Sequence, residues 1–338
     1  MLDNTTPSLA ASWIAVATVE ELGDEPLAVR VLGEPWVVAR LGPDRAVVAF
    51  ADRCPHRLAP LSAGSVVHGE LQCGYHGWRF DLSGACTLIP ALGPGATIPP
   101  RARLAVPAGV AELGGLVWLA PEQPLVALPP VAPPDDAIVG ILEPARAAVD
   151  AGEMIDNFLD AAHFPFVHPA SFGVEDAFDV RSDAITRDGW VVRSTFTAPY
   201  QNHDDPLVAT GEHPLIQQHT VTKVGHAGCN ASLELRFPLT GGVFGIVYAC
   251  QPESATSTRV FKVMCRNDVD EQGMAECVVA EDEILLEDLR ILERFTDMTL
   301  QLDLTIEVHT RADRLSVAWR RLMSDMRLQR RSAASWAS

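Results

Sequence analysis

Residues 53–80 read RCPHRLAPLSAGSVVHGELQCGYHGWRF, and two short pairs of metal-binding side chains stand out in this stretch. The first pair is Cys54 and His56, and the second, after sixteen intervening residues, is Cys73 and His76. Each pair supplies one thiol and one imidazole. The stretch therefore offers two Cys and two His ligands in an order that metal centres use.

Two readings of this ligand set compete. In a Rieske [2Fe–2S] cluster, two thiolates hold one iron and two imidazoles hold the other. A structural zinc ion also accepts two Cys and two His, but zinc fingers more often pair Cys with Cys and His with His along the chain. Gly74 and Gly77 allow tight turns that bring amides close to a cluster, and Trp78 and Phe80 are placed to shield it. The pattern favours the Rieske cluster.

The stretch from Arg53 to Phe80 resembles the Rieske domain of the Rieske-type non-haem iron oxygenases. Residues 57–60 read RLAP, and only Gly and Tyr separate Cys73 from His76, so neither loop has a spare cysteine. The Rieske proteins of respiratory complexes carry an additional disulfide across these loops. The resemblance is therefore to the branch that contains the oxygenases and the ferredoxins.

A second motif separates oxygenases from ferredoxins. Residues 154–168 read MIDNFLDAAHFPFVH, in which Asn157, Asp160 and His163 are each three apart. This spacing places the three side chains along one face of a helix. Pro165 kinks or ends such a helix, so the chain can turn back toward His163 after it.

This stretch resembles the Asn-x-x-Asp-x-x-His-x-x-x-x-His motif of the oxygenases. In that family the two His residues, here His163 and His168, hold a mononuclear iron together with one later carboxylate. Two imidazoles and one carboxylate leave open positions on Fe(II) for dioxygen. His163 taken alone is equally consistent with a buried core histidine, and it is the combination with the upstream cluster motif that favours iron.

The third ligand is expected on a helix over residues 275–295. Spacings of four and three residues define one apolar stripe, made of Val278, Asp282, Leu285, Leu289 and Leu292. Asp282 is its only charged member, and a buried carboxylate needs a partner, which a metal or an arginine can supply. The family's carboxylate ligand also falls near residues 281–283. We therefore expect Asp282 to complete the iron site.

The resemblance also implies catalytic-site roles for Asp160 and Asn157. In the family, the matching Asp links a Rieske-ligand His of one subunit to an iron-ligand His of the next, here His76 and His163. A carboxylate that accepts a hydrogen bond from each imidazole gives a short electron path and fixes both tautomers. The alternative for Asp160 is a charge that interacts with a helix dipole. The bridge implies an oligomer, and the resemblance implies that this oligomer is a head-to-tail homotrimer.

The composition of the chain excludes some classes of binding partner and indicates its cellular compartment. The chain has 338 residues, enough for two domains, and a net charge of −18 that argues against nucleic acid or an anionic membrane as a partner. Five of its seven cysteines lie outside the cluster motif without pairing spacing, which is typical of a reducing compartment. No signal peptide or span of ~20 apolar residues is apparent. We expect a cytoplasmic protein.

The order of strand and helix patterns predicts an α+β fold in two domains. Strand-like runs within residues 10–50 and at 117–119 predict a small all-β Rieske domain, residues 1–125, before a proline-rich linker over 121–134. Further strand-like runs between 190 and 265 predict one antiparallel sheet. With the helix over 275–295 and a terminal helix around 312–326, they predict a catalytic domain over residues 126–338, in which the sheet packs on helices.

These parts predict the oxygenase component of a multi-protein enzyme. The chain lacks a Gly-x-Gly-x-x-Gly nucleotide fingerprint, so its electrons must come from a separate reductase or ferredoxin. Its length resembles that of the O-demethylases of vanillate and dicamba, which favours hydroxylation or demethylation of a small, mainly apolar aromatic or polycyclic substrate. The alternatives are a cis-dihydroxylating ring dioxygenase, a Rieske electron carrier with a degenerate second domain, and a zinc-stabilised binding module.

Two further groups of residues have either a substrate-binding or a purely structural role. The polar residues Asn202, His203 and His213 contact substrate or cap a loop, and the loop interpretation is favoured. The aromatic residues Phe164, Phe166 and Phe172 line an apolar pocket or belong to the core.

Overall fold

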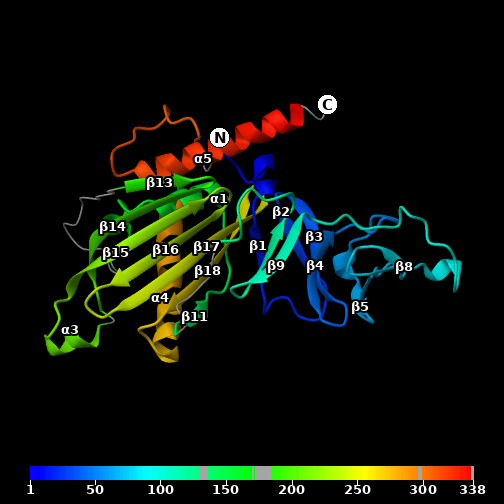
Figure 1. Cartoon of the computed structure of the whole chain (residues 1–338), viewed down its shortest axis with the longest axis horizontal. Coiled ribbons are helices and arrows are strands. Elements are labelled where there is room, and N and C mark those ends of the chain that lie inside the picture. Colours follow the sequence, from blue (N-terminus) through cyan, green and yellow to red (C-terminus); the bar gives the residue numbers. More distant parts are fainter. Residues whose placement is uncertain (130–135, 170, 172–183, 204, 296–298, 336–338) are drawn as a thin grey trace.

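The computed structural model describes residues 1–129, 136–169, 171, 184–203, 205–295 and 299–335, with side chains up to residue 329. Small β-sheets built from the first 120 residues lie at one end of an elongated molecule, and a large sheet lies at the other (Figure 1). The part of the proline-rich linker over 130–134 is outside the described residues. No helix in the described part is long and apolar enough to cross a membrane.

The N-terminal strands form three small antiparallel sheets. Short 3₁₀ helices, η1 (Pro7–Ala11), η2 (Leu61–Ala63) and η3 (Pro90–Leu92), flank them. The first sheet is β1 (Ile14–Thr18), β10 (Leu116–Ala120) and β9 (Gly109–Leu113); the second is β2 (Leu27–Val31), β3 (Glu34–Leu41) and β4 (Ala46–Ala51); the third is β5 (Ser65–Val67), β6 (Glu70–Gln72), β7 (Arg79–Phe80) and β8 (Cys86–Leu88).

Strand β10 joins the two halves of the molecule because it is apolar on both faces. Side chains alternate along a strand, so Val117 and Leu119 point one way and pack in the N-terminal core. Leu116 and Trp118 point the other way and pack against Phe261 of the large sheet. All five residues of the strand are buried, which explains why it reads as an unbroken apolar run.

The large sheet has eight antiparallel strands. Its order is β11 (Ile138–Ile141), β18 (Ser257–Arg266), β17 (Gly242–Ser254), β16 (Asn230–Phe237), β15 (Ile216–His226), β14 (Val191–Gln201) and β13 (Ala184–Asp188), with β12 (Ala145–Ala147) also paired to β18. The prediction of an α+β fold, with small all-β sheets followed by one antiparallel sheet packed on helices, is confirmed.

Helices cover the large sheet and carry its site. They are α1 (Ala151–Leu159), α2 (Phe164–Val167), α3 (Pro206–Thr210), α4 (Glu271–Leu292) and α5 (Arg314–Ser335). In Figure 1, α4 crosses behind the sheet and α5 runs along its upper edge. One core cluster joins α1, α4 and α5 to the strands, with Trp319 fully buried at its centre. The first residues of the chain belong to this core, since Leu2 N donates to Leu300 O at 2.8 Å.

Helix α1 is held in place by an ion pair with α5. Arg320 donates from Nε and Nη2 to the two carboxylate oxygens of Asp156, at 3.0 and 2.8 Å, and from Nη1 to Glu307 at 2.7 Å. The side chains of Arg320 and Asp156 are only 8% and 14% exposed. This ion pair fixes the rotation of α1 about its axis. It thereby also fixes the direction of the site residues at the end of the helix.

Removing one partner of this pair is expected to cost more stability than removing both. Arg320→Met leaves the Asp156 carboxylate buried and should destabilise the fold by about 3–5 kcal/mol. The double variant Asp156→Leu/Arg320→Met removes both charges and should recover most of that loss. Urea unfolding of the three proteins measures this, and equal losses in the single and double variants would contradict it.

Candidate active site

Two similar loops bring the four Cys and His residues of the first motif together. Cys54 N donates to Ala59 O at 2.9 Å, and in the second loop Cys73 N donates to Trp78 O at 2.8 Å. Each loop thus closes on itself around its cysteine. The loops pack tightly, because a Cβ on Gly74 would meet the carbonyl oxygen of residue 63 at 2.7 Å.

The four side chains divide into a buried half and an exposed half. Cys54 and Cys73 are each 2% exposed and belong to an apolar cluster with Phe80. His56 and His76 lie at the surface, with their Nδ1 atoms 3.2 Å apart. Buried thiols beside converging, exposed imidazoles suit a cluster whose inner iron takes sulfur and whose outer iron takes nitrogen. Trp78 stacks on His56 at 4.8 Å between ring centroids, which confirms its proximity to the site.

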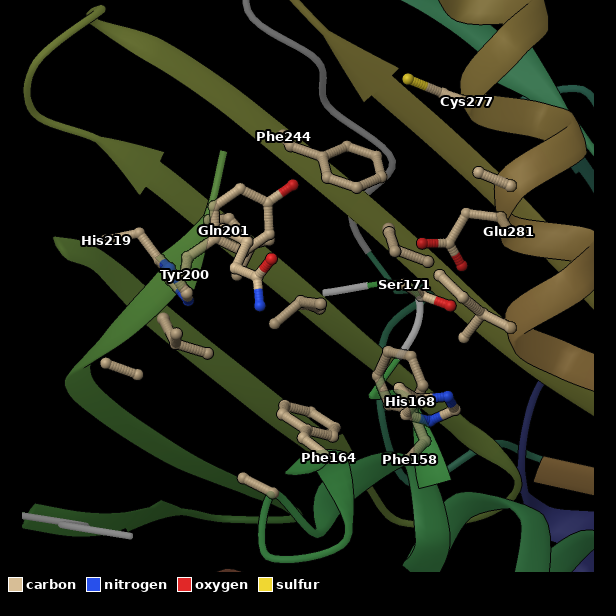
Figure 2. A pocket seen from close by; sticks show the side chains of 18 of the residues that line it. Phe158, Phe164, His168, Ser171, Tyr200, Gln201, His219, Phe244, Cys277 and Glu281 are labelled. Atoms are coloured by element: carbon tan, nitrogen blue, oxygen red, sulfur yellow. The ribbon is translucent and has the colours of Figure 1, made fainter. Parts of the chain in front are cut away.

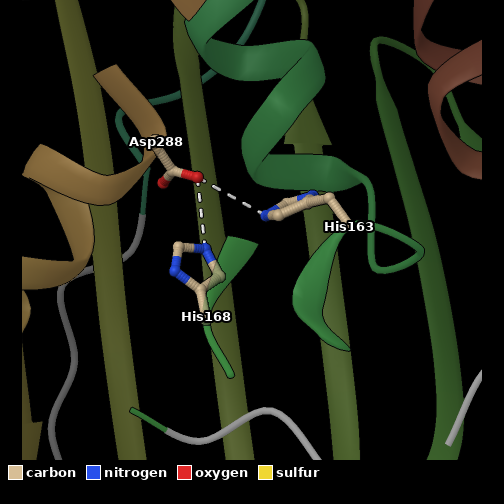
Figure 3. Close-up of side chains that lie close together, drawn as sticks. All are labelled: His163, His168 and Asp288. Atoms are coloured by element: carbon tan, nitrogen blue, oxygen red, sulfur yellow. Dashed lines mark ion pairs between the residues drawn. The ribbon is translucent and has the colours of Figure 1, made fainter. Parts of the chain in front are cut away.

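A second constellation lies between α1 and α4. His163 and His168 direct their Nε2 atoms at one oxygen, Oδ1 of Asp288, at 3.5 and 3.2 Å (Figure 3). One ligand atom from each of the three residues lies within 4.8 Å of the others. Asp288 Oδ1 is buried and accepts no hydrogen bond of good geometry. A buried oxygen of this kind needs a partner, and a metal between the three side chains supplies one.

Further carboxylates hold the outer nitrogens of both imidazoles. His163 Nδ1 lies 3.0 Å from Asp160 Oδ2, and His168 Nδ1 lies 2.7 Å from Glu287 Oε2. Each contact leaves Nε2 for the metal and fixes the orientation of the ring. Asn157 completes the set by hydrogen bonding to Asp288. Glu287 was not predicted to have a role, although its position next to Asp288 on the helix is a signal that could have indicated one.

Asp282 does not lie with the two histidines, so the expectation that it stands beside them is corrected: the carboxylate in that place is Asp288. It is half-buried and does not line the cavity at this site. Six residues at ~100° per residue place Asp282 about 120° round the helix from Asp288. The buried stripe of α4 passes through Glu281 rather than Asp282. The apolar spacing therefore identified the correct helix but chose the wrong carboxylate on it.

The backbone between Asn157 and His168 is not one helix. Helix α1 ends at Leu159, and Asp160 has an extended backbone with ψ at 149°. The Asp160 carboxylate then accepts hydrogen bonds from the N–H groups of Ala162 and His163, at 2.9 and 3.3 Å. The predicted alignment along one helical face is therefore wrong for His163, and this turn brings it beside Asp160 instead. The return of His168 after Pro165 agrees with the prediction.

Buried charges around this site are balanced. Burial opposes the charge of Asp160, but hydrogen bonds from His163 and Ala162 lower the pKa of its carboxyl to about 2. The positive charge nearby is Lys223, whose Nζ donates to Phe158 O at 2.9 Å and to the main-chain carbonyl oxygen of Asp160. Burial lowers the pKa of the Lys223 ammonium to about 8. Sequence reasoning did not identify Lys223, because nothing in its strand distinguishes it from a surface residue.

A cavity of about 1120 Å³ opens beside His163, His168 and Asp288, between the large sheet and α4. Figure 2 shows Phe158, Phe164 and Phe244 around it, with Tyr200 and Glu281 at its walls. The lining combines apolar and aromatic side chains with a comparable number of polar and charged ones, and a concave site of this size can enclose a small molecule.

The polar and aromatic residues for which the sequence allowed either a substrate-binding or a structural role differ in their positions. Phe164 and His203 line the cavity, whereas Phe166 is 71% exposed. Asn202 and His213 hold a loop together: Asn202 donates to Gln217 at 3.1 Å, and His213 Nδ1 lies 2.7 Å from a carboxylate oxygen of residue 205. The favoured loop interpretation therefore agrees with the structure for these two residues. Phe172 is outside the described residues.

Family models match both halves of the chain. Residues 12–106 match the Rieske [2Fe-2S] domain, and residues 148–329 match the vanillate O-demethylase oxygenase C-terminal domain. The second match covers more than half of the 338 residues.

Known proteins resemble the chain over most of its length. Methylxanthine N1-demethylase NdmA of Pseudomonas putida is 28% identical over 93% of this chain and 88% of that protein. The vanillate O-demethylase oxygenase subunit of a Pseudomonas species is 30% identical over 84% of each. The solved structure of the Pseudomonas putida NdmA protein with caffeine superposes with a TM-score of 0.83 at 26% identity, covering 97% of this chain and 94% of that one.

Metal content tests whether Asp288, rather than Asp282, binds the iron. Asp288→Ala should lose about one iron per chain, because it removes an oxygen ligand that two imidazoles alone do not replace. Asp282→Ala, on the same helix, serves as the matched control and should keep the iron of the parent protein. Elemental analysis of anaerobically purified protein measures the iron content of both variants. Iron loss in Asp282→Ala alone would show that Asp282 is the ligand after all.

Proposed function

The chain belongs to the Rieske non-haem iron oxygenases that carry a vanillate O-demethylase-type C-terminal domain, and we propose that it demethylates or hydroxylates a small, mainly apolar organic substrate. It is an oxygenase component with a Rieske [2Fe–2S] cluster and a mononuclear iron. The observation that carries the proposal is the convergence of His163, His168 and Asp288 beside the cavity.

The residues divide the work between two centres. Cys54, Cys73, His56 and His76 hold the cluster, and the three converging side chains described above hold the iron. When bound, the cluster supplies single electrons and the iron activates dioxygen. Asp160 and Glu287 hold the two imidazoles by their outer nitrogens, and Asn157 holds Asp288, so the ligands are positioned before any metal binds. The prediction that Asp160 and Asn157 serve the catalytic site rests on these contacts.

The proposed reaction consumes one dioxygen, two electrons and two protons for each C–H bond that becomes C–OH, with one water released. Where that carbon is a methyl group on oxygen or nitrogen, the C–OH product breaks its bond to that atom and leaves as formaldehyde. Demethylation is favoured over cis-dihydroxylation because the relatives that match along most of their length are named as demethylases. The cavity volume suits an aromatic or bicyclic substrate.

The electron path is proposed to run between subunits of a head-to-tail homotrimer, with His76 of one chain beside Asp160 of the next. In Figure 1, β2–β4 lie between the sheet that carries the cluster loops and the large sheet, so the two centres of one chain lie far apart. Large apolar side chains are exposed near both ends of the proposed contact: Leu58 and Tyr75 in the cluster loops are 67% and 66% exposed, and Phe166, next to the iron site in sequence, is 71% exposed. A contact between the two ends would cover them.

The remaining features of the proposal follow from the sequence and from the same structure. A separate reductase or ferredoxin supplies the electrons, and it is expected to approach the exposed imidazole edge of the cluster. All seven cysteines are free of disulfides, which supports a reducing, cytoplasmic compartment. We propose a division into a Rieske domain over 1–125 and a catalytic domain over 126–338, with the first eleven residues packed on the catalytic half.

Metal and product analysis tests the function. The protein should contain about three iron and two acid-labile sulfide per chain, and His163→Ala/His168→Ala should lose about one iron while keeping the cluster's colour. With a surrogate reductase and methoxy-aromatic or N-methyl substrates, the parent should release formaldehyde and the double variant should not. Two iron in both proteins would indicate an electron carrier, and zinc without sulfide would contradict the cluster.

Mixing subunits tests the path between chains. Asp160→Asn should keep both metal centres but lower formaldehyde formation roughly 10–100-fold, because it weakens the contact that fixes the imidazole. The exposed Asp303→Asn serves as control. Co-expression of a cluster-deficient His76→Ala chain with the His163→Ala/His168→Ala chain should restore activity in mixed trimers, since the cluster of one chain then faces the iron of the other. No recovery above either variant alone would contradict the path.

A further inference from the structure

A buried ion pair forms part of the cavity wall away from the iron ligands. Lys262 on β18 donates from Nζ to Glu281 Oε2 on α4 at 3.0 Å and to the Glu281 main-chain oxygen at 3.3 Å. The two residues are 4% and 9% exposed, and both line the cavity. Burying two charges is costly, so a buried ion pair retained in the wall of the cavity calls for a functional explanation.

The Glu281 carboxylate points into the cavity. Figure 2 shows it projecting from α4 toward the space bounded by Phe244 and His168. Glu281 precedes Asp288 by seven residues, or two helical turns, so both carboxylates lie on one face of α4 about 10 Å apart along its axis. Within the described part of the chain, only Lys262 binds the Glu281 carboxylate, through Oε2. Oε1 therefore remains as a hydrogen-bond acceptor for a molecule in the cavity.

The cations that line the cavity are already engaged by the protein. Among the described lining residues, Lys223 donates to two main-chain carbonyls, Lys262 binds Glu281, and Arg266 binds both carboxylate oxygens of Asp268 at 2.9 and 3.1 Å. No described lysine or arginine of the lining is left to neutralise an anion.

The histidine that lines the wall beside Tyr200 adds no positive charge. His219 is 7% exposed and packs edge-on against the Tyr200 ring, with 5.1 Å between ring centroids. Burial lowers the pKa of His219 to about 4, so its ring is neutral at pH 7. Among the residues that the structure describes, the cavity thus offers acceptors and aromatic faces but no unengaged lysine or arginine.

We propose that Glu281, positioned by Lys262, selects substrates with an N–H, O–H or ammonium group at the end remote from the oxidised carbon, and disfavours carboxylates there. The proposal rests on the proposed function and names its substrate class. It separates this chain from the relatives named for vanillate and dicamba, since both of those compounds are aromatic carboxylates.

The physical basis is the difference between two buried contacts. A donor placed against Glu281 Oε1 makes a charge-assisted hydrogen bond, which is stronger than a neutral one. A carboxylate in the same place would be desolvated beside a like charge, and that arrangement is unfavourable. A preference of about tenfold or more in Kd is expected from these magnitudes.

Three probes that differ in one group measure this preference: 3-methoxybenzylamine, 3-methoxybenzyl alcohol and 3-methoxybenzoate. Calorimetric titration of the anaerobic holoenzyme should give an affinity at least about tenfold higher for the amine than for the benzoate, with the alcohol between them. Glu281→Gln should reduce the preference about tenfold. Asp282→Asn, which removes a charge from the neighbouring residue on α4 that does not line the cavity, is the matched control and should leave the preference unchanged.

A paired variant guards against misfolding. Glu281→Gln/Lys262→Met removes both charges, leaves no unpaired buried ion, and should abolish discrimination while keeping the iron content and the thermal midpoint of the parent. Equal affinity of the parent for amine and benzoate, including no measurable binding of either, would overturn the proposal, as would a preference that survives Glu281→Gln.

The outcome is distinguishable from failure of the proposed function, because binding is read without turnover. If the protein prefers the amine but releases no formaldehyde, the proposed selectivity is supported and the proposed demethylase activity is contradicted. If the protein demethylates 3-methoxybenzoate and binds it as tightly as the amine, the demethylase activity is supported and the proposed selectivity is contradicted.

Discussion

Two imidazoles must present the same type of nitrogen to one point in space, and the rest of the site depends on this constraint. A neutral imidazole carries one proton, so the group that binds Nδ1 decides whether Nε2 is free for a metal. Asp160 and Glu287 make that decision for the two histidines. They come from opposite sides of the site, one from the turn after α1 and the other from α4. The docking of α1 and α4 on the large sheet is therefore a condition for the chemistry.

Gathering carboxylates in this way requires compensation by positive groups. Asp156 is paired with Arg320, and the main-chain carbonyls at the end of α1 are bound by Lys223. The ammonium of Lys223 also lies 4.5 Å from the centre of the Phe164 ring, where a cation is favoured. The acids nearest the metal are held by hydrogen bonds to polar groups, while the cations lie one layer further out. This arrangement leaves the metal-facing oxygen of Asp288 without competing donors.

The sequence predicted those parts of the molecule whose signal is local. The four cluster residues, the two histidines, the antiparallel sheet and the helix α4 all follow from spacing or alternation within short segments. Asp288 was missed because the stripe through Asp282 and Leu285 differs by one position from the buried stripe through Glu281, and a period of 3.6 residues tolerates that error over two turns. Glu287 and Lys223 act through partners more than 60 residues away, and a single sequence carries no signal of such pairs.

The first eleven residues precede the strands of the Rieske domain, yet they complete the core of the other half. Leu2 pairs with Leu300 through the backbone, and the Asn4 amide donates to Thr258 Oγ1 at 2.9 Å on β18. Asn4 Oδ1 also accepts from Ala151 N at 2.8 Å, at the first turn of α1. A chimaera that exchanged everything before the proline-rich linker would thus replace part of the support of α1. Interchange of Rieske modules between relatives is expected to succeed with a first junction near residue 12, so that the native N-terminal segment stays with its own catalytic half.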